Sequence, residues 1–210
     1  MRYPLAIFDF DGTLADSFPF FLSVFNSIAD QHGFRRIDLD RVESMRHHGT
    51  REMMRHLDMP AWKLPLASKS FMALMKENLD AIPLFEGVGQ ALHALADAGV
   101  QLAIVSSNSE HNVRRVLGPD LEALIGQYEC GMSIFGKASR IRAVLRHSGV
   151  DAHDAIYIGD QGTDAEAARK AKVPFGAVRW GYATIEALRL HQPEHEFGSV
   201  AELAGIAGDA

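Results

Sequence analysis

The sequence predicts an α/β fold, in which a parallel β-sheet is covered by helices on both faces and a helical segment is inserted near the N-terminus. Two observations support this prediction. Short, continuously apolar runs alternate with amphipathic helical patterns over most of the chain, and residues 17–82 contain helical patterns alone. Strands that are apolar throughout and separated by helices are typical of a parallel sheet buried on both faces.

Each element of the sheet region follows from a local pattern. The helical pattern at 87–98 places Val88, Leu92 and Leu95 on one face, and Gly99 suits its C-terminal cap. The alanine-rich helix near 170 ends before Pro174. The predicted strands are 5–8, 100–105, 155–158 and 175–178, the last taken as the final core strand, and the predicted helices are 87–98, 138–146 and 165–171.

The inserted segment divides the chain into two expected domains. Residues 1–15 and 84–210 form the α/β core, and residues 16–83 form a helical cap, with hinges near 15–18 and 82–86. Aromatic and methionine side chains recur in the insertion at helical spacing, which usually indicates core packing. The side chains concerned are Phe20, Phe21, Val24, Phe25, Ile28, Met53, Met54 and Leu57.

Composition limits the possible functions. The chain has 210 residues, a net charge of −6 and no long basic run, so nucleic acid and anionic membranes are not expected partners. Its single cysteine, Cys130, excludes an internal disulfide and favours a reducing compartment. No run of about 18 apolar residues is present, and acids at positions 9 and 11 interrupt any signal-peptide core. We therefore expect a cytoplasmic protein.

Polar side chains follow several predicted strands at the point where each strand ends. In parallel α/β sheets, binding sites form beyond these carboxyl ends, so the side chains are expected to meet. Four buried carboxylates would repel one another unless a cation lay among them, and an all-oxygen donor set favours Mg²⁺. The residues of this predicted site are Asp9, Asp11, Ser106, Lys137, Asp160 and Asp164.

Such a site suits phosphoryl transfer. Mg²⁺ and Lys137 would offset the acidic charge, so that a phosphate dianion could enter. Ser106 could donate its hydroxyl, and backbone N–H groups at Gly12, Thr13 and Ser107 could do likewise. One of the first two carboxylates could attack phosphorus, and the other could protonate the leaving oxygen and then activate water.

The motifs and their order resemble the haloacid dehalogenase superfamily of hydrolases. They are DFDGTL at 9–14, AIVSS at 103–107, Lys137 and IGDQGTD at 158–164. WGY at 180–182 and the AELAGI tail are similar to the phosphoglycolate phosphatase-like branch. The resemblance implies a Rossmann-like core with a small helical cap, a Mg²⁺ cofactor and a small phosphorylated metabolite as substrate.

The resemblance also implies a role for each acid. Asp9 is the nucleophile and a Mg²⁺ ligand. Asp11 is the acid/base and gives its backbone carbonyl to the metal. Asp160 binds Mg²⁺, and Asp164 supports the metal or the lysine. An acid at position 11 argues against dehalogenation, because the dehalogenase branch lacks one there.

The same resemblance assigns Ser106 and Lys137 to phosphoryl binding, but several alternatives stay open. The leading prediction is a Mg²⁺-dependent phosphatase, with phosphoglycolate as one possible substrate. A sugar phosphomutase on the same scaffold is an alternative, and a non-enzymatic phospho-switch is a remote one. The oligomeric state is either a monomer or a homodimer.

The helical insertion offers polar groups that could recognise the rest of a substrate. Arg46, His47, His48 and Arg51 lie in the stretch RHHGTRE, and Phe18 lies near the first hinge. A solvated helix face and a loop are the more common explanation for any one of these residues. We hypothesise that Arg46 or Arg51 contacts the polar part of the leaving group.

Other polar residues receive structural interpretations. Asn108 could support a residue of the site or cap the following helix, and the cap is favoured because asparagine is common at helix N-termini. His147, His153, His191 and His195 are scattered without metal-ligand spacing and are interpreted as surface residues.

Overall fold

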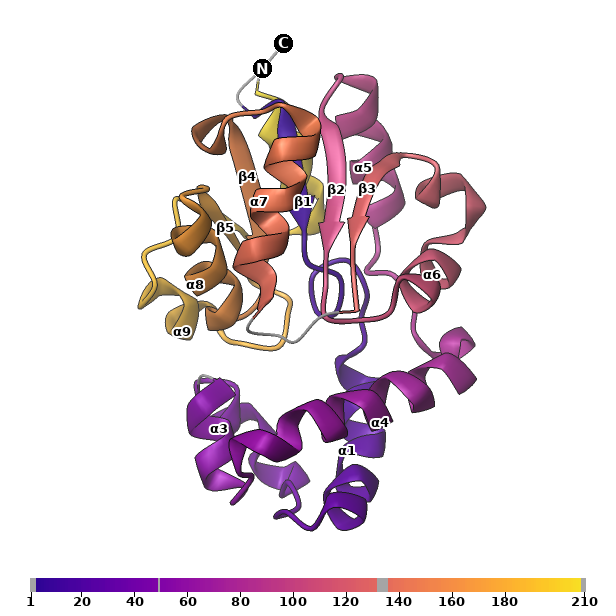
Figure 1. Cartoon of the computed structure of the whole chain (residues 1–210), viewed down its shortest axis with the longest axis vertical. Coiled ribbons are helices and arrows are strands. Elements are labelled where there is room, and N and C mark those ends of the chain that lie inside the picture. The colour runs from indigo at the N-terminus through magenta and orange to yellow at the C-terminus, as the bar shows by residue number, and fades with distance from the viewer. Residues whose placement is uncertain (1–2, 49, 132–135, 209–210) are drawn as a thin grey trace.

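A six-stranded parallel sheet forms the centre of the molecule (Figure 1). The computed structural model describes residues 3–48, 50–131 and 136–208. The strand order is β3-β2-β1-β4-β5-β6, so β1 lies in the interior of the sheet between β2 and β4. The strands are β1 (Leu5–Phe8), β2 (Gln101–Val105), β3 (Ile125–Glu129), β4 (Ala155–Gly159), β5 (Phe175–Val178) and β6 (His195–Phe197).

Helices cover both faces of this sheet because successive residues of each strand point to opposite sides. In β1, Ala6 and Phe8 pack with α5 and α6, whereas Leu5 and Ile7 pack with α7, α8 and α9. A 3₁₀ segment, Val200–Ala207, completes the first face. These helices are α5 (Val88–Asp97), α6 (Glu110–Glu122), α7 (Lys137–Ser148), α8 (Gly162–Ala171) and α9 (Ile185–Arg189).

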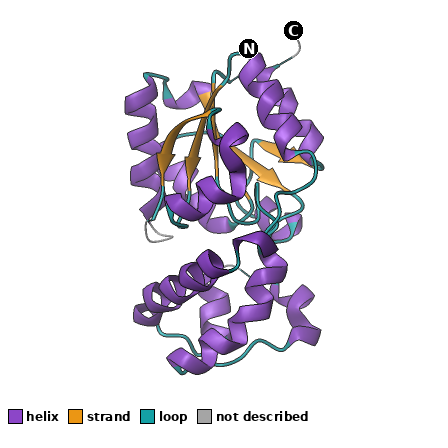
Figure 2. Cartoon of the chain, turned by 90° about the vertical axis from the view of Figure 1, so that its right-hand side faces the viewer, coloured by secondary structure: helices purple, strands orange, loops and turns teal. Residues whose placement is uncertain are grey.

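The described part of the insertion is entirely helical and lies beyond the carboxyl ends of the strands (Figures 1 and 2). It has its own small hydrophobic core, which includes Phe25, Ile28, Met54 and Leu57, as predicted. Phe20 packs instead with the main core. The helices are α1 (Phe18–His32), α2 (Val42–Met45), α3 (Thr50–His56) and α4 (Leu64–Glu77), with short 3₁₀ turns between and after them.

The chain leaves and re-enters the core at one place. Ala15 forms an isolated antiparallel bridge with Leu84, and the Asp16 amide donates to the Pro83 carbonyl at 2.9 Å. The two crossing segments therefore lie side by side at the predicted boundaries. Paired crossing segments are the geometry that a hinged cap requires. The division into a core and a mobile cap remains a proposal.

The four strands and three helices predicted for the core are confirmed, with ends that differ by at most three residues. The prediction that residues 175–178 form the last core strand is wrong, because β6 pairs with β5 at the sheet edge. β3 was also missed. Both missed strands lie at edges, where one side of the strand faces solvent and polar residues interrupt the apolar pattern. In the described residues, no helix combines the length and apolar character needed to cross a membrane.

Candidate active site

The predicted polar residues meet at the carboxyl ends of β1, β2 and β4. The ladder between β1 and β4 continues one residue past the strand, since the Asp9 amide donates to the Ile158 carbonyl at 2.8 Å. Asp9, Asp160 and Asp164 are all buried, and each offers an oxygen within 4.8 Å of the others. The neighbouring strands of a parallel sheet thus bring together acids that are far apart in the sequence.

Lys137 lies between two of these acids. As the first residue of α7, it is buried and donates from Nζ to Asp9 Oδ2 at 2.5 Å and to Asp164 Oδ1 at 2.6 Å. Burial lowers the pKa of Lys137, but the charges of Asp164 and Asp9 outweigh burial and raise it overall. Lys137 is therefore a fixed cation, and it lies against the predicted nucleophile.

Asp164 is tied to the lysine and to its own helix. Its Oδ2 accepts from the Gln161 amide at 3.0 Å, which caps the N-terminus of α8. Its Oδ1 also accepts from the Tyr157 hydroxyl at 3.3 Å. This geometry favours the lysine-supporting alternative for Asp164 over a direct metal contact.

Asp160 is held rigidly by two other segments. Its Oδ1 accepts from the Thr13 hydroxyl at 3.1 Å, and its Oδ2 accepts from the Tyr182 amide at 2.7 Å. Burial raises its pKa well above the usual range, and the charges of Asp164 and Asp9 add to the effect. Without a further cation, the charged form of this carboxylate is thus strongly disfavoured.

These residues fit a divalent cation. Three buried carboxylates are offset by Lys137 alone, and Asp11 Oδ1 is buried without a hydrogen-bond partner among the described residues. Burial raises the pKa of Asp9 to about 7, against the lowering effect of Lys137. A hard cation with oxygen ligands would supply the missing charge. The acids able to hold it are Asp9 and Asp160, together with the Asp11 carbonyl implied by the resemblance.

A tight turn carries the residues after β1. Gly12 has φ = 77°, and a Cβ there would collide with the Asp160 carboxylate and the Tyr182 ring. Only glycine therefore allows the turn to approach Asp160 this closely. The Gly12 amide donates to the Ala15 carbonyl at 2.9 Å, and the Thr13 amide donates to the Phe10 carbonyl at 3.2 Å. This geometry contradicts the expectation that these two amides bind phosphate, because the turn already uses them.

Asp11 points toward β2 and the loop that follows it. Its Oδ2 accepts from Asn108 Nδ2 at 2.9 Å. Burial raises the pKa of Asp11, while hydrogen bonding, including that from Asn108, opposes the rise. A raised pKa makes this carboxyl group better suited to giving and taking a proton than an ordinary, solvated aspartate. The prediction that Asn108 caps α6 is wrong, since Ser109 accepts from the Asn112 amide and is the cap.

We expect Asn108→Ala to lower kcat by about 10–100-fold with little change in KM, because the hydrogen bond to the Asp11 carboxylate is lost. Asn108 acts here as a positioning residue. The measurement is steady-state kinetics of the purified variant beside its thermal midpoint. The control is Asn78→Ala, which removes a hydrogen bond to Leu74 in the cap. Equal kcat values for Asn108→Ala and wild type would contradict this role.

The two predicted serines follow β2. Ser106 is buried, and its Oγ accepts from the Asn108 amide at 3.2 Å, so its own proton can be donated to a ligand. Ser107 lies at the wall of the cavity described next. Both positions agree with the predicted contact to a phosphoryl group.

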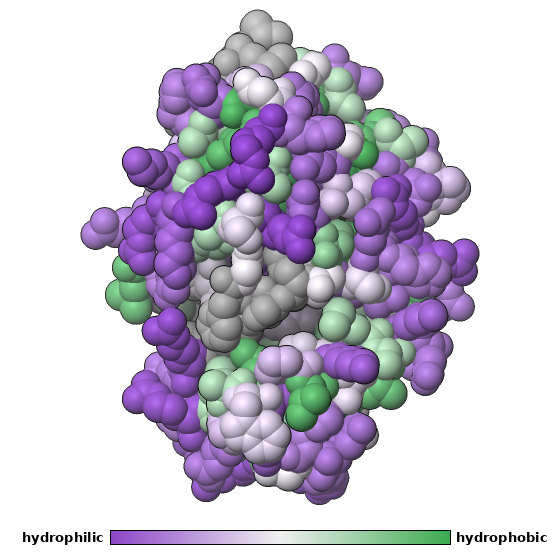
Figure 3. Space-filling view, viewed as in Figure 1, coloured by the Kyte–Doolittle hydropathy of each residue, from purple (hydrophilic) through white to green (hydrophobic). Residues whose placement is uncertain are grey.

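A cavity of about 370 Å³ extends from this site into the cap. Asp11, Ser107 and Asn108 line its end at the core. The cap contributes mainly apolar walls, and hydrophobic residues also reach the surface around the junction of core and cap (Figure 3). The apolar wall residues from the cap include Phe18, Phe21, Leu22, Met45, Met53, Phe71 and Met72.

Comparison with known proteins agrees with this geometry. A family model described as "Haloacid dehalogenase-like hydrolase" matches residues 6–178. The chain belongs to this hydrolase family.

Named relatives of this hydrolase cover most of its length. It is 30% identical to a phosphoglycolate phosphatase of Synechococcus elongatus, with 87% of this chain and 86% of the relative aligned. It is 32% identical to a phosphoglycolate phosphatase of Xanthomonas campestris over the same shares. A putative phosphoglycolate phosphatase from Lactobacillus plantarum has the same fold, with a TM-score of 0.80, 20% identity, and coverage of 98% of this chain and 100% of the other.

The cap of this haloacid dehalogenase-like hydrolase is bonded to the core. Arg46 donates from Nη2 to the Gly181 carbonyl at 2.7 Å and from Nε to the Tyr182 carbonyl at 3.0 Å. Its Nη1 bonds to Glu43. Arg51 lies exposed on α3 and is not among the residues that line the cavity. Arg46 does line the cavity, but its guanidinium bonds to the core and to Glu43, so the leaving-group contact stays a prediction.

Sequence reasoning gave no role to Trp180, Gly181 or Tyr182, although the WGY triplet was noted. Trp180 donates from Nε1 to the Thr13 carbonyl at 3.0 Å, and the Tyr182 hydroxyl bonds to Ser17 at 3.0 Å. The triplet therefore joins the turn after β1, Asp160 and the hinge. The available signal was a glycine between two aromatics directly after a predicted strand.

The four scattered histidines are only partly as predicted. His147 and His153 are exposed. The interpretation of His195 as a surface residue is wrong, because this side chain is half-buried and bonds to the Tyr3 hydroxyl at 2.9 Å. His191 is also half-buried and lines the cavity near Gly162.

Proposed function

We propose that this hydrolase cleaves a small phosphate monoester with the help of Mg²⁺, through a phosphoryl group carried transiently on Asp9. It is a phosphoric monoester hydrolase, as its family and its named relatives indicate. The observation that carries the mechanism is the buried Asp9–Lys137–Asp164 ion-pair group beside the separately held Asp11.

Each residue of the site has its own role in phosphoryl transfer, which follows from its position. Lys137 and the Ser106 hydroxyl hold phosphoryl oxygens, so that Asp9 faces phosphorus. Asp9 Oδ2 accepts from Lys137, so the attack on phosphorus is assigned to Oδ1. Asp11, with its raised pKa, gives a proton to the leaving oxygen and then takes one from the water that hydrolyses the acyl phosphate. A bound Mg²⁺ would supply charge stabilisation on the transferring phosphoryl group.

We expect activity to depend fully on a divalent cation. Removing metal with a chelator and desalting should lower phosphate release by at least about 100-fold, and added Mg²⁺ should restore it. The readout is released phosphate across a Mg²⁺ titration. Added K⁺ at matched ionic strength is the control. Undiminished activity after metal removal would contradict the metal role.

Two substrate classes are supported by different observations. The named relatives favour phosphoglycolate. The largely apolar walls of the cavity favour an ester with a larger, apolar alcohol part. A panel containing phosphoglycolate and esters of increasing apolar size, compared by kcat/KM with saturating Mg²⁺, distinguishes them. The class with the higher kcat/KM is the preferred one, and its kcat/KM should also exceed that of a generic aryl phosphate.

We propose that Arg46 holds the cap closed. Arg46→Ala should lower kcat/KM by about 10-fold on both phosphoglycolate and an aryl phosphate, because two hydrogen bonds to the core are lost. Arg55→Ala, at an exposed position on α3 of the cap, is the control and should change little. A loss confined to phosphoglycolate would instead favour a direct contact between Arg46 and the leaving group.

The other expectations carry less support. A sugar phosphomutase is not favoured, since the matched relatives are named as phosphatases. Membership of a hydrolase family also disfavours a non-enzymatic phospho-switch. The proposed partner is a small phosphorylated metabolite. A cytoplasmic location and a monomeric or homodimeric state stay predictions.

A further inference from the structure

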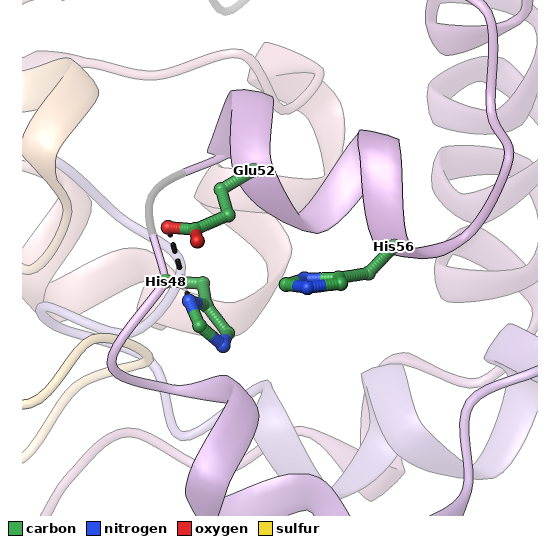
Figure 4. Close-up of side chains that lie close together, drawn as sticks. All are labelled: His48, Glu52 and His56. Atoms are coloured by element: carbon green, nitrogen blue, oxygen red, sulfur yellow. Dashed lines mark ion pairs between the residues drawn. The ribbon is translucent and has the colours of Figure 1, made fainter.

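A cluster of metal-binding side chains lies in the cap, apart from the acidic site. It consists of His48, Glu52 and His56 (Figure 4). Glu52 and His56 are four residues apart on α3, so they share one face of that helix. His48 precedes the helix and points back toward both. One possible ligand atom from each side chain lies within 4.8 Å of the other two.

The three side chains are close enough together to share one metal ion. His48 Nδ1 lies 3.0 Å from Glu52 Oε2, and the two imidazole rings are 4.6 Å apart at their centroids. Ligands bound to Zn²⁺ at 2.0–2.2 Å stand about 3.3–3.5 Å from one another. Because the three ligand atoms lie within 4.8 Å of one another, rotation of the side chains could bring all three around one ion.

A simple ion pair explains less of this arrangement. The pair between His48 and Glu52 would stabilise the cap by only a few tenths of a kcal/mol. The ion pair also does not explain why the imidazole of His56 lies beside that of His48. His47 is directed elsewhere, since its Nδ1 bonds to Thr184 Oγ1 at 2.9 Å.

We propose that His48, Glu52 and His56 form a binding site for Zn²⁺ or a similar transition-metal ion in the cap. Two nitrogen donors and one carboxylate suit Zn²⁺, whereas Mg²⁺ prefers oxygen ligands alone. The site is thus distinct in chemistry from the acidic site of the core. His48 is half-buried and His56 exposed, so an ion can enter from solvent.

The ion would fix the cap segment at residues 46–48, which contacts the core. It would tie residue 48 to α3, and the residues just before it, Arg46 and His47, bond to the core loop at 181–184. His48 and Glu52 also line the cavity, so a bound ion would lie close to it. The proposal does not depend on the phosphatase mechanism.

The test is a Zn²⁺ titration of the untagged protein against a chromophoric chelator, with excess Mg²⁺ present to fill the acidic site. We expect one Zn²⁺ per chain in the wild type. His48→Ala and His56→Ala should each weaken binding by at least about 10–100-fold, the loss that even outer-shell changes cause. Zn²⁺ should raise the thermal midpoint of the wild type but not that of His56→Ala.

Two control variants address other surface histidines. His93 forms an isolated pair with Asp120 at 2.9 Å, and His153 lies in an exposed group with two aspartates. His93→Ala and His153→Ala should bind Zn²⁺ as the wild type does. The circular dichroism spectrum and the thermal midpoint without added Zn²⁺ show whether each variant is folded. The proposal is overturned if the wild type binds no stoichiometric Zn²⁺. It is also overturned if His48→Ala and His56→Ala bind Zn²⁺ as tightly as the wild type does.

Discussion

Asp9→Asn is expected to lower turnover by at least about 10⁴-fold while the protein stays folded. The amide cannot attack phosphorus to form an acyl phosphate, so the covalent step is lost. The fold should survive, because burial raises the pKa of Asp9 to about 7 and a neutral side chain is therefore tolerated at this position. Lys137 would keep its second partner, Asp164. The measurement is phosphate release with saturating Mg²⁺, alongside the thermal midpoint.

The matched control is Asp97→Asn, an equal change at an exposed position near the end of α5. It should leave turnover unchanged. Mass spectrometry of the Asp9→Asn protein must show that the amide has not deamidated to aspartate. Full activity of an intact Asp9→Asn protein would refute the assignment of the nucleophile.

Lys137→Met is expected to abolish activity and also to destabilise the fold, by about 3–5 kcal/mol. Lys137 is the common partner of Asp9 and Asp164, and its removal leaves both carboxylates buried without a cation. Chemical denaturation gives the free energy of unfolding, and phosphate release gives activity. Mg²⁺ should stabilise this variant more than the wild type, because the ion then replaces the positive charge that the cluster has lost.

Lys170→Met on α8 is the control, since Lys170 is exposed and its nearest acid, Glu166, lies 4.0 Å away. Such surface pairs contribute little to stability. The variant should match the wild type in both measurements. If Lys137→Met were as stable as Lys170→Met, the buried ion-pair group would not have the energetic role proposed for it.

Much of the fold could be predicted from the sequence because the interior strands are apolar on both faces. The run at 5–8 and the run at 155–158 have no polar residue to obscure the pattern, apart from the Tyr157 hydroxyl, which bonds to Val105 and Asp164. The edge strands β3 and β6 could not be found this way. Their pairing depends on neighbours that a local pattern does not contain.

The acidic site was predictable for a related reason. Asp9 and Asp160 directly follow interior strands, Asp11 and Asp164 lie a few residues further on, and the parallel sheet brings these positions together. The partners of these acids were harder to predict. Asn108 has the local signature of a helix cap, yet Ser109 takes that role and frees Asn108 for Asp11. Arg46 looked available for substrate, but its partners are core carbonyls that only the folded cap brings near.

The central claim is that Asp9 carries the phosphoryl group, and trapping the phosphoenzyme tests it most directly. The enzyme is quenched during turnover with Mg²⁺ and substrate, reduced with borohydride and digested, and the peptides are sequenced by mass spectrometry. An acyl phosphate on Asp9 is reduced to homoserine, so homoserine at position 9 in the wild type, and its absence in Asp9→Asn, is the expected result. Homoserine at Asp11 or at another acid, with position 9 unchanged during turnover, would contradict the account.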